Sequence, residues 1–455
     1  MIQDKPPYRV PSMAEIAAIP WNGYTAISTF SGCGGSSLGY KMAGFKVLWA
    51  SEFIPAAQEV YRINHKNTIL DTRDIRKVTS GDILDAISLE AGDLDLLDGS
   101  PPCASFSTAG KREAGWGKVK NYSDTKQRVD DLFFEYARIV KGVQPKVFVA
   151  ENVSGLVKGT AKGYFKMILS ELKACGYTVS ARLLDAQWLG VPQMRQRVIF
   201  IGVRNDLVQK YGVKPTHPRP LPYRYSVRDA LPWIDAIEGA NGFSNHAFTS
   251  SEKPAATAAQ SRPLNVEALP RAYRDKRGAF GNDGDITDQP APTVLSDSVG
   301  THWIVGVGTK EGVRSADKPA PSVLTPVRQH TTSELTIVEA ESDISRYAIG
   351  AEWDKIRQGE QSQKYFQMTK PDVALPCPTV TQRGGDNTAA SVVHPTEKRK
   401  FSIAELRRIC AFPDDFILTG TYAQQWERLG RAVPPVMMMH IAKTIRDEIL
   451  AKCQQ

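Results

Sequence analysis

The sequence predicts an α/β fold over roughly its first 210 residues, and two observations support this prediction. Short apolar segments that suit buried strands alternate with amphipathic segments that suit helices between residues 24 and 203. Several apolar segments end in glycine, proline or acidic residues, as strands do at the ligand-binding edge of an open sheet. We therefore expect a mostly parallel sheet with helices on both faces.

The first predicted strand covers residues 24–30, and a helix over residues 36–43 follows it. Gly32, Gly34 and Gly35 lie between them, where glycine lets the backbone approach a ligand beside a helix N-terminus. The spacing is not Gly-x-Gly-x-x-Gly, and no Gly-Lys-Ser/Thr follows, which disfavours pyrophosphate and triphosphate sites. A plain tight turn is the alternative interpretation.

The second predicted strand, residues 45–50, ends beside Glu52 and Phe53. An acid about twenty residues after a glycine turn, at a strand end, is placed to accept hydrogen bonds from ribose hydroxyls. A helix-capping glutamate is the alternative. Asp74 and Ile75 follow in a loop, as an acidic and apolar pair that could hold and cover an adenine.

Residues 92–97 form the next predicted strand, and Pro101 and Pro102 stop it abruptly. Cys103 is thereby placed at the C-terminal edge of the sheet, on a stiff turn. The alternative interpretation is a small buried cysteine at a corner of the fold.

A helix over residues 130–140 and a strand over residues 146–150 come next, and Glu151 and Asn152 follow at the same edge of the sheet. A further helix (164–175) and two strands (178–185 and 198–203) complete the pattern.

Gln193, Arg195 and Arg197 precede the last of these strands. In extended backbone, alternate residues point to one face, so these three polar side chains would be presented together. They suggest recognition of oxygen or nitrogen acceptors. A solvated edge strand is the alternative.

The composition changes after about residue 205, where proline, glycine and polar residues become more frequent. We expect three segments: a catalytic and cofactor domain (1–210), a recognition domain (211–400) and a C-terminal segment (401–455) that returns to the first domain. A proline-rich phrase recurs at 288–294, 317–323 and 375–380, and each copy is predicted to lead into a short strand. Such strands could present loops to a partner, or the prolines could simply protect strand edges.

The C-terminal segment contains two predicted helices. Ser402 and Glu405 form a capping box at the start of the first, residues 402–410, which follows the basic cluster 398–400. The second, residues 436–450, has apolar residues at core-packing spacing.

Composition narrows the class of protein further. The six cysteines lack the spacing of a zinc site or a disulfide scaffold, so we expect no metal and a reducing cytoplasm. No apolar run of about twenty residues occurs, and no secretory signal is seen, so we expect no membrane association. The net charge of +8 favours a polyanionic partner.

Taken in order, these motifs resemble the DNA cytosine-5 methyltransferase family. The matching residues are Phe30, Gly32, Gly34, Gly35, Glu52, Asp74, Ile75, Pro101, Pro102, Cys103, Glu151, Asn152, Val153, Gln193, Arg195, Arg197, Phe412, Pro413, Asp414, Gly430, Ala432 and Val433. The resemblance implies a Rossmann-like S-adenosylmethionine-dependent methyltransferase domain with a smaller, irregular strand-and-loop target-recognition domain.

The resemblance also implies roles for individual residues. Cys103 would be the nucleophile that adds to carbon 6 of cytosine, and Glu151, in protonated form, would contact ring nitrogen 3. Arg195 and Arg197 would anchor the pyrimidine. The cofactor site would be lined by Phe30, Gly32, Gly34, Gly35, Glu52, Phe53, Asp74, Ile75, Pro101 and Val433. Because this chemistry is impossible within stacked DNA, the target base must be flipped out.

The sequence departs from the family pattern at Arg431, where asparagine is usual, and at Cys410, where glutamine is usual. A guanidinium about 5 Å from the donor sulfonium would repel it by roughly 3 kcal/mol. One interpretation is that Arg431 turns to a phosphate or carboxylate. The other is a donor with its own anion, carboxy-S-adenosylmethionine, which would make the enzyme a carboxymethyltransferase.

Rival functions are a catalytically silent DNA-binding protein, a nicotinamide-dependent oxidoreductase and a transfer-RNA methyltransferase of the same fold. The long segment 205–395 favours double-stranded DNA, with Gln193, Asn152, Arg328 and Arg383 as candidate contacts. We expect a monomer in the cytoplasm of a bacterial or phage-infected cell. The sequence does not distinguish a restriction-modification enzyme from a solitary one.

Overall fold

The chain forms two compact units in a computed structural model. The structure describes residues 5–102, 120–122, 125–127, 131–157, 162–234, 302–306 and 335–454. Unit 1 comprises Met1–Tyr225, Cys410–Phe412 and Arg431–Gln455, and unit 2 comprises Ser226–Ile409 and Pro413–Gly430. The division into catalytic, recognition and C-terminal segments drawn from the sequence stays a prediction, because compactness assigns no role to either unit.

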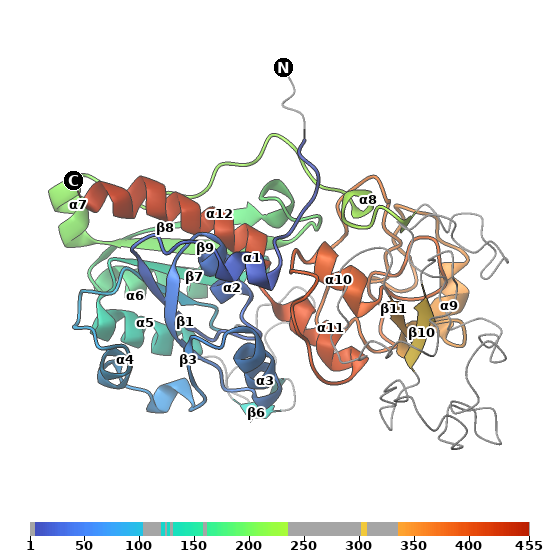
Figure 1. Ribbon diagram of the computed structural model, residues 1–455, viewed down its shortest axis with the longest axis horizontal. Coiled ribbons are helices and arrows are strands. Elements are labelled where there is room, and N and C mark those ends of the chain that lie inside the picture. The colour runs from blue at the N-terminus through green and yellow to red at the C-terminus, as the bar shows by residue number, and fades with distance from the viewer. Residues whose placement is uncertain are drawn as a thin grey trace, which may run out of the picture. The chain divides into compact units, whose positions relative to one another are not determined.

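A seven-stranded sheet organises unit 1, with the strand order β3-β2-β1-β4-β7-β9-β8 (Figure 1). The strands are β1 (Thr25–Thr29), β2 (Lys46–Ser51), β3 (Ile69–Asp71), β4 (Leu96–Gly99), β7 (Val147–Val153), β8 (Tyr177–Asp185) and β9 (Gln196–Arg204). The first five run parallel, and β9 is antiparallel to both β7 and β8. The predicted mostly parallel α/β fold is therefore confirmed.

Helices cover both faces of this sheet (Figure 1). Met437, Met438 and Ile441 of one helix pack with Tyr40 of another against one face, and Phe133 and Ile168 lie in the core on the other face. The helices of unit 1 are α1 (Met13–Ala17), α2 (Gly35–Met42), α3 (Pro55–Asn64), α4 (Ser80–Ile87), α5 (Leu132–Val143), α6 (Lys162–Ala174), α7 (Asn205–Tyr211) and α12 (Pro435–Ile445). Beyond α12 the chain continues as a π-helical turn, Arg446–Leu450, so the predicted helix 436–450 changes its winding near its end.

The strand that leads toward Cys103 begins later than predicted. Gly92 has a φ of 102° and its N–H donates to the Val143 carbonyl, so the chain is still turning over residues 92–95. The strand, β4, therefore covers Leu96–Gly99 and includes Asp98.

Two other strand predictions need correction. Strand β7 extends to Val153 because β9 pairs with it along its full length, so Glu151 and Asn152 lie inside the strand and not after it. Strand β9 begins at Gln196, so of the three residues predicted to share one extended face only Arg197 lies on the strand.

The described part of unit 2 contains short helices and an antiparallel pair of strands. These are α8 (Val227–Ala230), α9 (Ala348–Trp353), α10 (Ile403–Ile409), α11 (Tyr422–Arg431), β10 (His302–Gly306) and β11 (Leu335–Glu339). The capping box predicted for α10 is present, since the Glu405 N–H donates to Ser402 Oγ and the Ser402 N–H donates to Glu405 Oε2.

The repeated proline-rich phrase is only partly described. Its copies at 288–294 and 317–323 lie outside the described residues, whereas the copy at 375–380 leads into turns at 382–385 and not into a strand. Gly384 and Gly385 pack directly on Trp426 there, and a Cβ at Gly384 would lie only 2.2 Å from the indole nitrogen. This close packing explains why the chain turns at this point.

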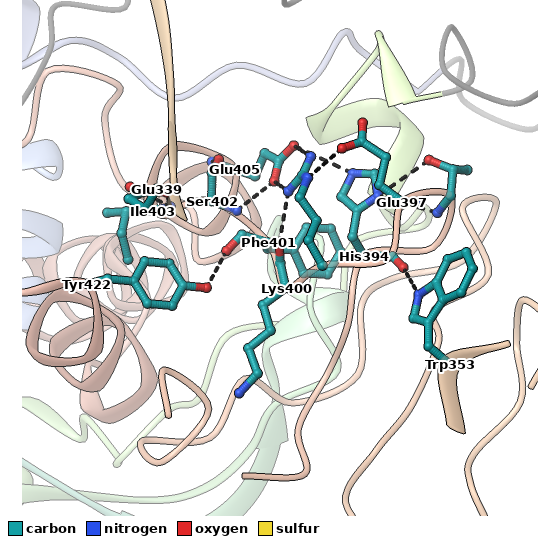
Figure 2. A network of polar contacts seen from close by, with 12 residues as sticks. Glu339, Trp353, His394, Glu397, Lys400, Phe401, Ser402, Ile403, Glu405 and Tyr422 are labelled. Carbon is teal, nitrogen blue, oxygen red and sulfur yellow. Dashed lines mark hydrogen bonds and ion pairs between the residues drawn. The ribbon is translucent and has the colours of Figure 1, made fainter. Parts of the chain in front are cut away.

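A buried ionic network crosses the core of unit 2 (Figure 2). Arg399 donates to both carboxylate oxygens of Glu405, at 2.7 and 2.8 Å, and also pairs with Glu397. Lys400 is fully buried and donates to the carbonyls of Gly384, Asp386 and Ala389. Two of the three residues in the predicted basic cluster 398–400 are thus internal.

Within the described residues, no helix is long and apolar enough to span a membrane. Those residues also contain no group of three or more His, Cys, Asp or Glu side chains arranged to hold a metal ion.

Candidate functional site

The turn between β1 and α2 has the conformation that its glycines allow. Gly34 has a φ of 93° and is the N-cap of α2, and even Phe30, at the end of β1, has a φ of 53°. A Cβ at Gly35 would lie 2.3 Å from the Val433 carbonyl oxygen, so the protein itself fills the space beside Gly35. At Gly32, by contrast, an added Cβ would meet nothing within 4 Å. The space beside Gly32 is therefore open to a ligand.

Glu52 lies directly beside this turn. Its carboxylate accepts hydrogen bonds from the Gly32 N–H and the Ile54 N–H, each at 2.7 Å, and the residue is 8% exposed. Burial raises the pKa of Glu52, while the backbone N–H groups and the positive charge of Arg431 act in the opposite direction. Phe53 is half-buried next to it.

Asp74 and Ile75 follow β3 at the same edge of the sheet. Ile75 is buried by the protein itself and packs in the core below this edge of the sheet. Asp74 accepts from the Arg76 N–H and also pairs with the Arg76 guanidinium, which in turn binds Asp131. Part of the hydrogen-bonding capacity of Asp74 is therefore already used by the protein.

The turn that follows β4 is described only as far as Pro102, and Cys103 lies outside the described residues. Pro101 is buried, and its carbonyl oxygen accepts a hydrogen bond from Asn152 Nδ2 at 3.3 Å. Asn152 thus connects β7 to the segment that carries Cys103. In this structure it holds the turn in place, and its predicted contact with DNA stays a prediction.

A charged cluster lies where β7 and β9 run side by side. Arg197 Nε is 2.6 Å from Glu151 Oε1, and both side chains are nearly buried, at 13% and 11% exposure. Arg195 is 1% exposed and lies close enough for its charge to interact with those of Arg197 and Glu151. Burial, followed by repulsion from Arg197, lowers the pKa of Arg195 to about 9. Two cations and one anion thus share a site with little access to water.

Gln193 completes this cluster on its buried side. Its Nε2 lies 3.2 Å from Cys410 Sγ, and both residues are buried. Burial raises the pKa of the Cys410 thiol to about 11, so the sulfur is a neutral thiol at ordinary pH. Gln193 is therefore packed against the protein interior, and its predicted contact with DNA stays a prediction.

Two further predicted DNA contacts lie outside unit 1 or outside the described residues. Arg383 is exposed on a loop of unit 2, and Arg328 lies outside the described residues. Sequence reasoning also missed one residue. Asp98, on β4, is a buried acid, and a charged residue at the end of an otherwise apolar strand was the signal that could have identified it.

Comparison with known proteins identifies the family. The family model of the C-5 cytosine-specific DNA methylases matches residues 24–447. This chain belongs to that family. The predicted resemblance is thereby confirmed, and so is the prediction that the protein is an enzyme that methylates DNA at cytosine.

Curated relatives of this cytosine methylase are type II methyltransferases. The chain is 28% identical over 436 residues to M.DdeI of Desulfomicrobium norvegicum, a match that covers 92% of this chain and 88% of the relative. It is 38% identical over 192 residues to M.NgoPII of Neisseria gonorrhoeae, which covers 42% of this chain and 51% of that protein.

The fold of this methylase has also been seen in a solved structure. A candidate DNA modification methyltransferase encoded within a prophage of E. coli superposes with a TM-score of 0.57 at 19% identity, covering 94% of this chain and all of that one. At this level of identity the comparison supports the fold alone.

The residues at the sheet edge fit a nucleoside cofactor. The Glu52 carboxylate can accept hydrogen bonds from hydroxyl groups, and the open space beside Gly32 allows a ligand to approach the backbone closely. The cluster at Glu151 offers what a pyrimidine requires, since carboxyl and guanidinium groups can bond its ring nitrogen, amine and oxygen.

Proposed function

We propose that this methylase transfers the methyl group of S-adenosylmethionine to carbon 5 of a cytosine flipped out of a specific duplex DNA sequence, through a covalent bond to Cys103. The observation that carries the proposal is the nearly buried Glu151–Arg197 pair, with Arg195 beside it, on the strand that Asn152 connects to the turn before Cys103. Membership of the family indicates the reaction, cytosine methylation. The carboxyl and guanidinium groups of this cluster are of the kinds that can stabilise its transition state.

The residue types match the chemistry. Carbon 5 of cytosine is a weak nucleophile until the Cys103 thiolate adds to carbon 6 and drives ring electrons toward carbon 5. Glu151 would take up a proton, donate it in a hydrogen bond to ring nitrogen 3 and accept a hydrogen bond from the exocyclic amine. Arg197 would bond the ring oxygen, so both groups would stabilise charge that develops on the ring. Carbon 5 would then bond the methyl carbon while the bond from that carbon to the sulfonium breaks, which would leave a neutral thioether. Loss of the carbon 5 proton would restore the carbon 5–carbon 6 double bond and expel the Cys103 thiolate.

The cofactor proposal rests on the turn after β1. When bound, S-adenosylmethionine supplies an electrophilic methyl group. Glu52 would accept from the ribose hydroxyls, the backbone at Gly32 would approach the cofactor closely, and Ile75 would pack against the adenine. We also propose that Phe30, Gly34, Phe53, Asp74 and Pro101 line the cofactor site, and that Gly35 and Val433 form its wall through their close contact.

Arg431 does not require an anionic donor. Its positive charge already interacts with the Glu52 carboxylate, which supplies an anion from the protein itself. The Glu52 carboxylate counters part of the repulsion that suggested carboxy-S-adenosylmethionine, so the simpler donor, S-adenosylmethionine, is proposed. We therefore propose methylation, and not carboxymethylation, as the reaction.

The substrate proposal is duplex DNA in a bacterial cell. Cytosine methylation defines the family, and the relatives named above are type II methyltransferases of bacteria, which suggests a place in a restriction-modification pair. The positive net charge of +8 suits a phosphate backbone. Arg328 and Arg383 remain candidate DNA contacts, and a monomer remains the expected state.

The test combines target discovery with covalent trapping. DNA from cells that express the protein is sequenced at base resolution for 5-methylcytosine, which gives the target sequence. A duplex is then made with 5-fluorocytosine at the target, because fluorine cannot leave as the carbon 5 proton does and the adduct persists. We expect a protein–DNA adduct that needs S-adenosylmethionine and is lost in Cys103→Ala.

Controls separate this proposal from its rivals. Cys453→Ser removes a partly exposed thiol and should trap as the wild type does. Adduct formation by Cys103→Ala would refute the nucleophile. Binding without methylation would favour the silent DNA-binding protein, and preference for structured RNA over duplex DNA in a gel-shift competition would favour the transfer-RNA enzyme.

A further inference from the structure

Asp98 is a buried acid that the proposed chemistry does not use. It is 1% exposed on β4, where it pairs with Ser28 of β1 on one side and Val149 of β7 on the other. In the part of the chain that the structure describes, it forms hydrogen bonds with hydroxyl groups and no ion pair. An ionised carboxylate is costly to bury in this way, and perturbed acids of this kind cluster at functional sites.

The hydroxyl groups around Asp98 come from the two elements that form the cofactor turn. Ser28 Oγ donates to Oδ2 at 2.9 Å, and Tyr40 Oη donates to Oδ1 at 3.0 Å. Ser36 is a third hydrogen-bonding partner. Ser36 and Tyr40 are one helical turn apart on α2, and Ser28 lies near the end of β1. One carboxylate therefore connects β1, α2 and β4.

The position of Asp98 gives this connection a consequence. The β1–α2 turn contains Gly32 and Gly34, and β4 leads within four residues to Pro101 and Pro102, just before Cys103. A shift between α2 and β4 would change the distance between the donor and the nucleophile. Methyl transfer is sensitive to such shifts, because an error of about 1 Å can cost on the order of a hundredfold in rate.

We propose that Asp98 is a positioning residue of the methyltransferase site, and that its ionised carboxylate holds the cofactor helix α2 against the strand that carries the nucleophile. The proposal rests on the proposed function. Protonation removes one acceptor from the three hydroxyl groups, loosens the connection and slows methyl transfer.

The electrostatic surroundings agree with a change of ionisation near neutral pH. Burial raises the pKa of Asp98 to about 7, the hydroxyl groups of Ser28, Tyr40 and Ser36 act in the opposite direction, and the charge of Glu151 on β7 raises it further. Tyr61 of α3 and Tyr136 of α5 also face this acid. Burial raises the pKa of both, so they stay neutral while Asp98 titrates.

The experiment compares wild type, Asp98→Asn, Tyr40→Phe and Ser28→Ala. Asparagine has the shape of aspartate but cannot ionise, and the neighbouring hydroxyls can rotate to satisfy its amide. We measure kcat, and KM for S-adenosylmethionine, on the target duplex between about pH 6 and pH 9. Wild-type kcat should rise to a plateau with a midpoint near 7.

Asp98→Asn should lose this rise. Its kcat should be about tenfold below wild type at high pH and should approach wild type at low pH. Tyr40→Phe and Ser28→Ala each remove a donor that stabilises the anion, so they should move the midpoint to higher pH. They keep Asp98 and give the test a second route if Asp98→Asn fails to fold.

Two results would overturn the proposal. One is a kcat profile for Asp98→Asn that is parallel to wild type at every pH, which would indicate a purely structural role. The other is an unchanged midpoint in both hydroxyl variants. If the wild type transfers no methyl group to DNA, the proposed function fails instead. The rate of amide hydrogen exchange then decides the role of Asp98. Exchange in residues 35–42 should be faster in Asp98→Asn than in wild type at high pH only, and equal exchange would refute the proposal.

Discussion

Glu52 shows how one side chain connects two parts of the cofactor turn. Its two carboxylate oxygens accept from backbone N–H groups on either side, at Gly32 and Ile54. Glutamine in its place has one acceptor oxygen and an amide that would face an N–H donor. The geometry of the turn therefore depends on a carboxylate at this position.

We predict that Glu52→Gln weakens S-adenosylmethionine binding by at least about tenfold, because it breaks a charge-assisted hydrogen bond and leaves a buried N–H without an acceptor. Isothermal titration calorimetry with the cofactor measures this loss. Glu59→Gln, an exposed position on α3, is the matched control and should bind as the wild type does. Equal affinities for the two variants would contradict the role of Glu52.

Cysteine reactivity provides a second test for single residues. Burial raises the pKa of Cys410 to about 11 and also raises the pKa of Cys175, so both should remain protonated and slow to alkylate. We predict that limited treatment of the native protein with a maleimide, read by mass spectrometry, leaves these two cysteines unmodified and labels Cys453. Rapid labelling of Cys410 would show that the Gln193 contact opens in solution.

How far the sequence predicts single residues depends on how local the signal is. The proximity of Glu151, Arg195 and Arg197 follows from strand ends meeting at one sheet edge, and the structure brings them together. The roles of Asn152 and Gln193 do not follow, because their partners, Pro101 and Cys410, are distant in sequence. No periodic pattern encodes such a contact.

At the scale of an element, the network around α10 illustrates the cost of a buried charge (Figure 2). Arg399 and Glu405 are both more than 90% buried, and Arg399 also neutralises Glu397. Burial alone would raise the pKa of Glu405, but the charge and hydrogen bonds of Arg399 outweigh it and hold the pKa well below its usual value. Removal of the cation would leave two acids without a counter-charge from this residue.

We predict that Arg399→Ala destabilises the protein by about 3–5 kcal/mol, the usual effect of breaking a buried ion pair. Lys398→Ala removes a neighbouring, more exposed cation paired with Asp354 and should cost less than about 1 kcal/mol. Urea unfolding followed by tryptophan fluorescence measures both. A similar loss in the two variants would contradict the importance of the buried pair.

The same pair predicts a dependence on pH. Because the folded-state pKa of Glu405 is lowered, its contribution to stability is present above the unfolded value near 4 and is lost as the pH falls below it. Arg399→Ala lacks this contribution, so the stability difference between wild type and variant should narrow toward about pH 3. A difference that stays constant from neutral to acidic pH would contradict the assignment.

Elements show a clear limit of the sequence patterns. The alternation of strands and helices predicts a mostly parallel sheet. The capping box at Ser402 predicts the start of α10. The cluster 398–400 looks like a basic surface, yet Arg399 and Lys400 are internal. Their acceptors are Glu405 and three loop carbonyls, and a local sequence window does not reveal that these acceptors surround them.

At the scale of the whole molecule, net charge predicts how binding to DNA responds to salt. The chain has a net charge of +8, and each phosphate that a cation neutralises releases counterions. We predict that affinity for the target duplex falls by at least about tenfold between 50 and 200 mM salt. Fluorescence anisotropy over a salt series measures the slope. A slope near zero would argue against a binding surface dominated by phosphate contacts.

The whole fold was largely predictable, because the α/β alternation and the family motifs extend over most of the chain. The DNA sequence that the protein recognises was not predictable. It depends on side chains in loops, and no periodic pattern in the sequence determines where loop side chains point. Arg328 is outside the described residues. Arg383 is exposed, and its exposure alone does not identify the DNA base that it would contact.

The contact between Gly35 and Val433 has a consequence for truncated forms of the protein. A Cβ at Gly35 would lie only 2.3 Å from the Val433 carbonyl oxygen, and Met438 of α12 packs on Gly39 of α2. Nearly four hundred residues separate these partners, so residues 433–438 must be present before the wall behind the β1–α2 turn is complete. A chain cut before residue 433 would therefore lack this wall of the turn.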